Sequence, residues 1–309
     1  TMFAQGFAKA LGTRNVYASS TQDCSNKFAV AERMYGFPML QTIPDFEHAE
    51  MFIIIGANPA VSKFSFKGVP GILRKLKAAE ERGCRIISIN PRKTETVHTL
   101  GEHLPVRPDT DVFFLLAFAN CILTSTGVYA DRGVHAGEND STGGRIARDG
   151  GRNTVDRQGI DQYMKNFEGF AEAVRPWTPE RSETVTGISA ETVRNLAEAF
   201  TAAEGASLYG STGINHGSHG TIAFWLIEAI NAVTGNLDTK GGTLVGKGII
   251  NFPKLATGSG AMGSTVRSRI GNLPAVSEAL PGAILADEIL TPGKGQVRGL
   301  FVTAGNPAL

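Results

Sequence analysis

Residues 51–60, MFIIIGANPA, combine an apolar run with a tight polar turn. The run Met51–Ile55 has β-branched residues at three positions, which is typical of a strand that a parallel sheet buries on both faces. Gly56 lets the backbone turn sharply, and Pro59 removes a hydrogen-bond donor and stops the strand. We therefore expect a buried strand that brings Asn58 to a ligand at its carboxyl end.

The same pattern occurs at the far end of the chain. Residues 299–308, GLFVTAGNPA, again place glycine, asparagine and proline after an apolar run. The repeat predicts two similar strand ends and therefore two similar ligand sites, of which the second includes Gly305, Asn306 and Pro307.

The composition excludes several classes of partner. The chain has 309 residues, of which 42% are hydrophobic and 19% charged, as is usual for a globular protein of two domains. A formal net charge of +1 provides no electrostatic surface for nucleic acid or an anionic membrane. The most apolar segment, residues 112–123, is shorter than the roughly 18 apolar residues that span a bilayer. We expect neither a nucleic-acid partner nor direct membrane insertion.

The cysteines are few and far apart. Cys24, Cys84 and Cys121 form no Cys-x-x-Cys pair, so the sequence predicts neither a disulfide framework nor a zinc or iron–sulfur site. A reducing, cytoplasmic location is the simplest expectation. Asp23 precedes Cys24 in a polar loop, and spacing alone favours an Asx turn with a half-buried thiol over a functional site.

Strands and helices alternate along the chain. The strand at 51–55, a helix that carries Ile72, Leu76 and Ala79, and a strand at 85–89 predict a right-handed parallel crossover. Further helices are predicted at 112–124, 189–200 and 221–234, and a further strand at 206–210. Residues 130–160 lack periodicity and indicate a surface excursion.

The alternation predicts an α/β fold of two pseudo-symmetric, doubly wound, Rossmann-like units with mostly parallel sheets. We expect the first unit at residues 25–205. The second, incomplete unit would combine residues 1–24 with residues 206–309.

Four predicted turns follow strands, at residues 56–60, 90–96, 210–217 and 305–308. Any one of them could be an ordinary turn, but four with similar residues favour ligand binding at the carboxyl edge of a sheet. Arg92 adds a cation to the second turn, which suits a diphosphate or a ribose.

Two other motifs have simpler explanations than a nicotinamide site or a metal site. Residues 258–263, GSGAMG, match the dinucleotide fingerprint, but no strand precedes them, so we do not expect a nicotinamide site. His216 and His219 lie among glycines in a loop, which favours hydrogen bonding to a ligand or exposure to solvent over metal ligation.

Several motifs, in this order, together resemble the molybdopterin oxidoreductases of the dimethyl sulfoxide reductase and formate dehydrogenase group. They are Asn15-Val16 with Asp23-Cys24, IGANP at 55–59, INPRKT at 89–94, RPDTD at 107–111, GINH at 213–216, TGNL at 234–237 with Gly241-Gly242, and GNP at 305–307. The resemblance covers essentially the whole chain.

The resemblance implies molybdenum or tungsten held between two molybdopterin guanine dinucleotides, one bound by each of two pseudo-equivalent α/β domains. By position, one dinucleotide would contact Gly56, Asn58, Pro59, Asn90, Pro91, Arg92, Thr94 and Asp111, whose carboxylate would accept from guanine N–H groups. The other would contact Gly213, Asn215, His216, Gly235, Asn236, Gly305, Asn306 and Pro307.

The resemblance also implies one protein ligand to the metal, from the loop that follows Val16. An ungapped count places this ligand at Asp23, and a shift of one residue places it at Cys24. Related enzymes use either a carboxylate or a thiolate. We predict Asp23 because a carboxylate suits an oxidised, hard metal centre, and we take Asp23, Cys24 and His216 as candidate catalytic residues.

The function implied is the transfer of an oxygen atom or a hydride equivalent on a small-molecule substrate, with an electron-transfer subunit as a further partner. Formate is not the expected substrate, because formate dehydrogenases place His directly after their metal ligand, whereas Cys24 follows Asp23 in this chain. We expect a fragment, with an iron–sulfur domain upstream and a cofactor-capping domain downstream. The alternative is a non-catalytic electron-transfer scaffold that resembles the large subunit of respiratory NADH dehydrogenase.

Overall fold

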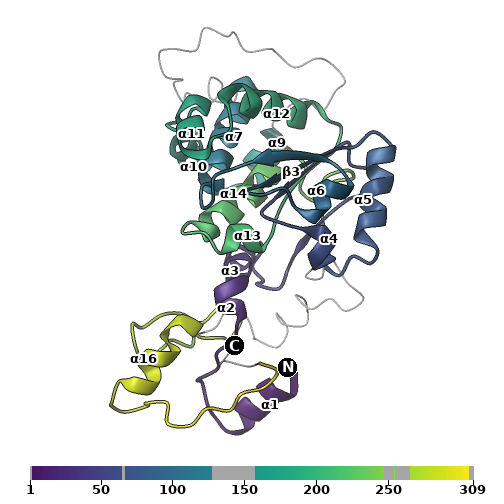
Figure 1. Ribbon diagram of the computed structural model, residues 1–309. Coiled ribbons are helices and arrows are strands. Elements are labelled where there is room, and N and C mark those ends of the chain that lie inside the picture. Colours follow the sequence, from purple (N-terminus) through teal and green to yellow (C-terminus); the bar gives the residue numbers. More distant parts are fainter. Residues whose placement is uncertain (1, 65–66, 127–156, 247–253, 255–264, 306–309) are drawn as a thin grey trace. The chain divides into compact units, whose positions relative to one another are not determined.

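A computed structural model describes the chain except for residues 1, 65–66, 127–156, 247–253, 255–264 and 306–309 (Figure 1). The chain forms two compact units. Unit 1 consists of residues 1–40 and 247–309, and unit 2 of residues 41–246. Most of the predicted surface excursion and the 258–263 motif lie outside the described residues.

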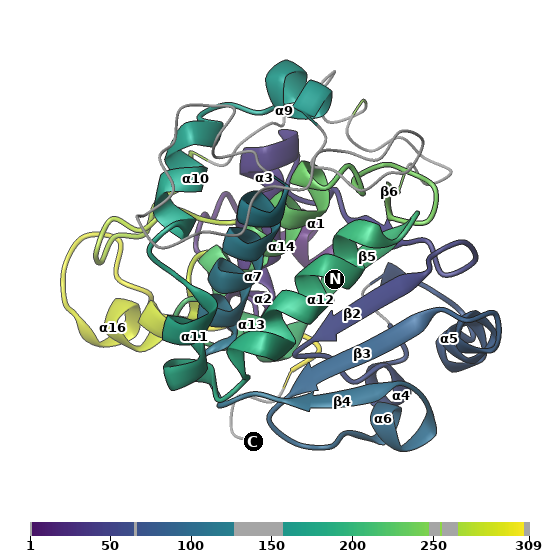
Figure 2. The ribbon, with the colours of Figure 1, turned by 90° about the horizontal axis from the view of Figure 1, so that it is seen from above.

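Unit 2 is built on a parallel sheet of four strands in the order β4-β3-β2-β5. The strands are β2 (Met51–Ile55), β3 (Arg85–Asn90), β4 (Glu102–Pro105) and β5 (Ala206–Gly210). Figure 2 shows β2, β3 and β4 side by side. All five residues of β2 are buried, which confirms the strand predicted at 51–55.

The helices of unit 2 connect and cover these strands. They are α4 (Pro59–Ser62), α5 (Ile72–Glu81), α6 (Glu95–Thr99), α7 (Asp111–Ser125), α9 (Arg157–Tyr163), α10 (Phe167–Val174), α11 (Pro179–Thr186), α12 (Ala190–Ala202), α13 (Thr212–Asn215) and α14 (Gly220–Val233). The predicted cap of α12 is confirmed, because the Ser189 hydroxyl accepts from the Thr192 N–H at 3.2 Å. A short antiparallel pair, β1 (Thr42–Pro44) with β6 (Thr243–Val245), completes the unit.

Each face of the sheet buries its own core, because successive side chains of a strand point to opposite faces. Ile53 and Ile55 pack with apolar residues of α7, α12 and α14. Phe52 and Ile54 pack on the other face with Phe46 and with apolar residues of α5. The sheet is therefore held between two apolar layers, and within the described residues the loops at its strand ends are left to contact a ligand.

Side-chain amides satisfy the outer edge of β5. Asn231 of α14 is fully buried, accepts from the Leu208 N–H at 3.0 Å and donates to the Leu208 carbonyl at 2.8 Å. Asn236 accepts from the Ala206 N–H at 3.0 Å. Because an unpaired buried backbone group is costly, these two asparagines stabilise β5, which among the described strands of its sheet pairs with β2 alone.

The observed division of the chain differs from the predicted domains, 25–205 and 1–24 with 206–309. β5 begins at Ala206 and pairs with β2 along its whole length, from Met51↔Ala206 to Ile55↔Gly210. The residues that follow 205 therefore complete the first sheet instead of starting a second one.

Unit 1 contains α1 (Met2–Ala10), α2 (Ser20–Asp23), α3 (Ser25–Tyr35), the 3-10 helix η2 (Gly282–Ile284) and α16 (Leu285–Leu290). Its described residues include no strand longer than an isolated bridge, such as Tyr17↔Leu280. Across the described residues of both units, no helix is long and apolar enough to cross a membrane.

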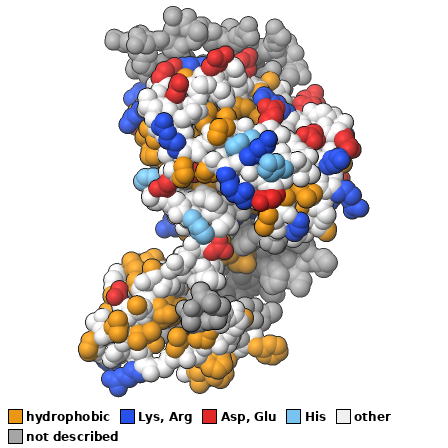
Figure 3. Space-filling model, in the orientation of Figure 1, with side chains coloured by type: hydrophobic (Ala, Val, Ile, Leu, Met, Phe, Trp, Pro, Cys, Tyr) orange, Lys and Arg blue, Asp and Glu red, His pale blue; other side chains and the backbone are white. Residues whose placement is uncertain are grey.

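The strand predicted at the second apolar run is wrong for its described part. Residues 299–303 form no regular structure, and Leu300, Phe301 and Val302 are 54%, 71% and 47% exposed. Figure 3 shows many exposed hydrophobic side chains, in orange, on unit 1. A strand is stable only when a neighbour pairs with its N–H and C=O groups, and the described part of unit 1 offers no such neighbour.

Candidate functional site

The turn after β2 is shaped by one glycine and one proline. Gly56 has φ 57° and donates its N–H to the Ile89 carbonyl at 3.0 Å. Pro59 begins α4 and is buried, which ends the strand as predicted. Asn58 stands between them with its side chain directed at the neighbouring turn.

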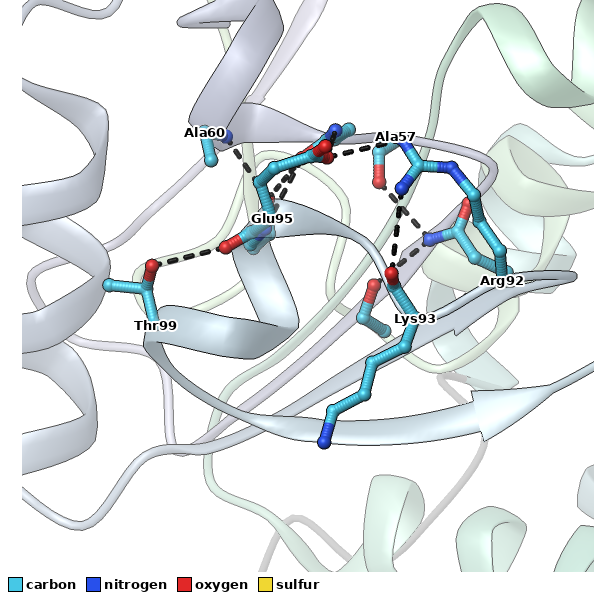
Figure 4. Close-up of polar contacts among 10 residues, drawn as sticks. Ala57, Ala60, Arg92, Lys93, Glu95 and Thr99 are labelled. Atoms are coloured by element: carbon cyan, nitrogen blue, oxygen red, sulfur yellow. Dashed lines mark hydrogen bonds and ion pairs between the residues drawn. The ribbon is translucent and has the colours of Figure 1, made fainter.

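The turn after β3 is hydrogen-bonded to this first turn (Figure 4). Asn90 donates to the Ala57 carbonyl at 3.1 Å. Asn58 Oδ1 accepts from the Thr96 hydroxyl at 2.8 Å, and that hydroxyl accepts from the Ala60 N–H at 3.0 Å. Since these groups connect two separate strand ends, the two turns form one rigid surface at the carboxyl edge of the sheet.

Charged side chains lie on the exposed rim of this surface. Arg92 contacts the Glu95 carboxylate at 3.1 Å, and Asn58 donates to the same carboxylate at 2.6 Å. The pKa of Glu95 is lowered to about 2, first by its own backbone N–H and then by Asn58 and Arg92. Pro91, Arg92 and Lys93 are exposed, so the two cations can reach an anionic ligand.

Thr94 has an unused hydrogen-bonding group in this turn. Its side chain is 4% exposed, and its hydroxyl has no hydrogen-bond partner in the described part of the chain. A buried polar atom without a partner costs free energy unless a ligand or a water satisfies it. The Thr94 hydroxyl is therefore suited to bind a ligand oxygen.

The turn after β5 packs directly on the turn after β2. Gly213 donates its N–H to the Gly56 carbonyl at 2.9 Å. A Cβ at Gly213 would lie 2.7 Å from that carbonyl oxygen, and a Cβ at Gly56 would lie 2.7 Å from the Ile214 N. Both predicted glycines thus permit close approach of two backbones. In the same turn Asn215 is buried and His216 is exposed.

The loop after β4 completes the row of turns. Asp111 begins α7 and is partly buried. Its pKa is raised to about 6, mainly by burial and also by the charge of Asp109, while its own backbone N–H opposes the rise. Burial makes the ionised form of the Asp111 carboxyl group less favourable, and hydrogen-bond donors from a ligand would stabilise that form again. The site therefore favours a ligand that carries such donors.

Two predicted site residues lie at the opposite edge of the sheet. Asn236 bonds the first residue of β5, Ala206, and donates to the Thr234 hydroxyl at 2.9 Å. Gly235 has φ 72° and ends α14 beside it. Both therefore support the start of β5, and the structure does not bring them to the turns at its carboxyl end.

The candidate metal ligands belong to unit 1. Asp23 ends α2 and is exposed, whereas Cys24 is 8% exposed. Burial raises the pKa of the Cys24 thiol, with a further rise from Asp23 and a lowering by Lys27. Thr21 fixes this loop, because its hydroxyl accepts from the Gly282 N–H at 2.8 Å. No group of three or more His, Cys, Asp or Glu residues that could hold a metal ion occurs among the described residues.

The remaining predictions are only partly covered. Gly305 is described, whereas Asn306 and Pro307 lie outside the described residues. All three cysteines are free and buried.

Sequence reasoning missed Asn231 and the contact between Asp109 and Ser218. Asp109 accepts from the Ser218 N–H at 2.7 Å and from its hydroxyl at 2.6 Å. A buried asparagine on an apolar helix was a usable signal for Asn231. Nothing local marks a contact between residues 109 positions apart.

Relatives with known activities share stretches of this sequence. The F420-dependent formate dehydrogenase subunit alpha of Methanocaldococcus jannaschii is 26% identical over 203 residues, which cover 66% of this chain and 25% of that protein. The biotin sulfoxide reductase of Cereibacter sphaeroides is 27% identical over 284 residues, covering 84% of this chain and 34% of that protein. The chain thus spans about a quarter to a third of the length of these relatives.

A solved structure shows the same fold. The acetylene hydratase from Pelobacter acetylenicus matches with a TM-score of 0.60 at 20% identity, over 78% of this chain and 28% of that one. The model of the molybdopterin oxidoreductase family matches residues 1–308. With nearly every residue inside that match, the chain belongs to the molybdopterin oxidoreductase family.

Proposed function

We propose that this chain is the central cofactor-binding part of a molybdenum or tungsten oxidoreductase. The carboxyl edge of the sheet in unit 2 would hold a molybdopterin guanine dinucleotide. The observation that carries the proposal is the row of four hydrogen-bonded or packed turns at one sheet edge, which includes a buried hydroxyl and a carboxylate suited to a ligand.

The residues at this edge fit such a cofactor. The Thr94 hydroxyl and the exposed cations Arg92 and Lys93 suit the diphosphate. The Asp111 carboxylate suits the N–H donors of guanine, since it can accept two hydrogen bonds. Gly56, Asn58, Pro59, Asn90 and Pro91 would shape the surface, and Asn58 in particular fixes the distance between two turns.

A second dinucleotide is part of the proposal. Unit 1 would be part of a second, incomplete α/β unit, and Gly305, Asn306 and Pro307 of this unit would contact the second dinucleotide. Gly213, Asn215 and His216 belong to the turn after β5, which packs on the turn after β2, and they would contact a dinucleotide at this sheet edge. Asn236 and Gly235 are left out, because they support the opposite edge of the sheet.

We propose Asp23 as the protein ligand to the metal. Its carboxylate is exposed at the end of α2, whereas the Cys24 side chain is buried. A carboxylate suits a hard, oxidised metal. X-ray absorption on the full-length protein counts sulfur neighbours, so a sulfur that disappears in Cys24→Ser would assign the ligand to Cys24 instead.

When bound, the cofactor's metal would supply two-electron redox chemistry for oxygen-atom or hydride-equivalent transfer on a small substrate. The chain's own residues would bind and orient it. An electron-transfer subunit and an upstream iron–sulfur domain would complete the electron path. A reducing compartment such as the cytoplasm fits three cysteines that are all free.

Elemental and nucleotide analysis of the full-length protein tests the proposal against a non-catalytic scaffold. We expect about one molybdenum or tungsten atom and two guanine nucleotides per chain. Asp111→Ala removes a pair of charge-assisted acceptors worth about 1.5–3 kcal/mol each, so cofactor retention after gel filtration should fall at least roughly tenfold. Protein that contains neither metal nor guanine would support the scaffold.

A further inference from the structure

The left-handed backbone of Asp109 is unusual for a residue with a side chain. Its φ is 64°, a conformation that glycine adopts freely and other residues adopt at a cost. A glycine here would avoid that cost. The presence of aspartate therefore points to a contact of its side chain.

That contact joins two turns of the site. Asp109 Oδ1 accepts from the Ser218 N–H at 2.7 Å, and Oδ2 accepts from the Ser218 hydroxyl at 2.6 Å. A Cβ at the preceding residue, Gly217, would lie 2.7 Å from Oδ1, so only glycine lets the two turns meet this closely. Each carboxylate oxygen thus accepts one hydrogen bond from Ser218, and the two bonds fix the orientation of the Asp109 side chain.

The turn that carries Asp109 is anchored on its other side. Arg107 donates its backbone N–H to the Thr186 carbonyl at 2.9 Å and its guanidinium to the Val185 carbonyl at 3.0 Å. The Thr110 hydroxyl donates to the Arg107 carbonyl at 2.7 Å. Asp109 thus extends from a fixed turn, and it can transmit that fixed position to the turn after β5.

The contacted turn holds two of the predicted ligand-binding residues. Asn215 and His216 lie three and two residues before Ser218, on the segment that packs against Gly56 through Gly213. Phe113 of α7 also contacts the His219 ring, with centroids 5.8 Å apart. The segment is therefore held at Gly213 and again at Ser218, with Asn215 and His216 between the two points.

We propose that Asp109 is a positioning residue for the dinucleotide site, which holds the turn of Asn215 and His216 in place relative to Asp111 through its two hydrogen bonds to Ser218. This inference rests on the proposed function for its ligand. The hydrogen bonds between Asp109 and Ser218 do not depend on the proposed function. The positioning role and the proposed function can therefore be tested separately.

Two variants separate positioning from stability. Asp109→Gly removes the two hydrogen bonds and relieves the left-handed backbone, so the two effects partly offset and the free energy of unfolding should stay within about 1 kcal/mol of the wild type. Asp109→Asn keeps both hydrogen bonds, because its Oδ1 can accept from the Ser218 N–H and its Nδ2 can donate to the Ser218 hydroxyl. If Asp109 only stabilises the fold, the affinity for a ligand should change in each variant in parallel with its free energy of unfolding.

The first measurement is hydrogen exchange of the peptide that covers residues 212–219, without ligand. Asp109→Gly should exchange about tenfold faster than the wild type, in line with the loss of a hydrogen bond to a charged group. Asp109→Asn should exchange within about twofold of the wild type. Unchanged exchange in Asp109→Gly would overturn the proposal.

The second measurement is calorimetric titration of the full chain with guanosine diphosphate, with adenosine diphosphate as the control nucleotide. Asp109→Gly should bind guanosine diphosphate about five- to tenfold more weakly, and Asp109→Asn should bind it as the wild type does. Equal affinity in Asp109→Gly, or an equal loss in Asp109→Asn, would overturn the positioning role. If the wild type binds no guanosine diphosphate while the exchange result holds, the proposed site fails, and the Asp109 contact is structural only.

Discussion

Residues 51–60 and 299–308 carry the same pattern of apolar run, glycine, asparagine and proline, yet the described residues of the two segments fold differently. The first run is β2, paired on both sides and buried at all five positions. The described part of the second run is exposed and forms no strand. An apolar run becomes a strand only where neighbouring strands supply partners for its backbone.

The largest difference should appear when one apolar side chain is shortened in each run. Ile54 is fully buried in β2, so Ile54→Ala should lower the free energy of unfolding by about 2–5 kcal/mol. Val302 is 47% exposed, and Val302→Ala should change that free energy by less than about 0.5 kcal/mol. Urea unfolding followed by circular dichroism measures both. Equal losses would show that the second run is packed as tightly as the first.

The two glycines of the pattern should differ next. In Gly56→Ala the φ of 57° and the approach of the new Cβ to within 2.7 Å of the Ile214 N should together cost about 2–4 kcal/mol. At Gly305 the nearest atom to a new Cβ is 3.8 Å away, so Gly305→Ala should leave thermal stability unchanged. A tolerated Gly56→Ala would mean that the two turns are not in close contact.

The third comparison concerns pH, because a partly buried carboxylate at a ligand site lowers the free energy of unfolding when it is ionised. The pKa of Asp111 is raised to about 6, so the folded protein holds this proton more tightly than the unfolded chain does. The resulting stability is complete below about pH 4 and is lost as the pH rises through 6. The free energy of unfolding of Asp111→Asn should therefore exceed that of the wild type by about 2 kcal/mol at pH 8, and this difference should shrink toward pH 4.5.

An exposed carboxylate of unit 1 provides the control for this experiment. Asp287→Asn should change stability by less than about 0.5 kcal/mol at either pH. Unfolding curves at pH 8 and pH 4.5 give both results. A pH-independent effect of Asp111→Asn would contradict the assigned protonation.

The smallest effect is expected at the hydrogen bonds between turns. Thr96 is fully buried, and Thr96→Val removes the hydroxyl shared by Asn58 and Ala60, at a cost of about 1 kcal/mol. Thr303 is exposed in the second run, and Thr303→Val should have no measurable effect. Denaturation midpoints of both variants decide whether the contact between turns stabilises the fold.

The sequence predicted those features that depend on neighbouring residues. The apolar run of β2, the cap at Ser189 and the glycine that ends α14 are local signals, and all three are confirmed. The strand predicted at 299–303 is wrong. Its local pattern is typical of a strand, but the described residues of unit 1 include no strand that could pair with it.

The candidate site could be predicted only turn by turn. The glycines at 56 and 213 pointed to close approaches, but the sequence did not reveal that they approach each other. Asn236 was placed in the site by resemblance, and its contact with Ala206 at the other end of β5 depends on the pairing order of the sheet. Such contacts follow from topology, which no local pattern encodes.

A crystal structure of the full-length protein with its native cofactor tests the central claim most directly. The account predicts a guanine whose N–H groups donate to the Asp111 carboxylate. It also predicts a diphosphate oxygen within hydrogen-bonding distance of the Thr94 hydroxyl, at the carboxyl edge of β3. A dinucleotide that contacts neither residue and lies away from this edge would contradict the account.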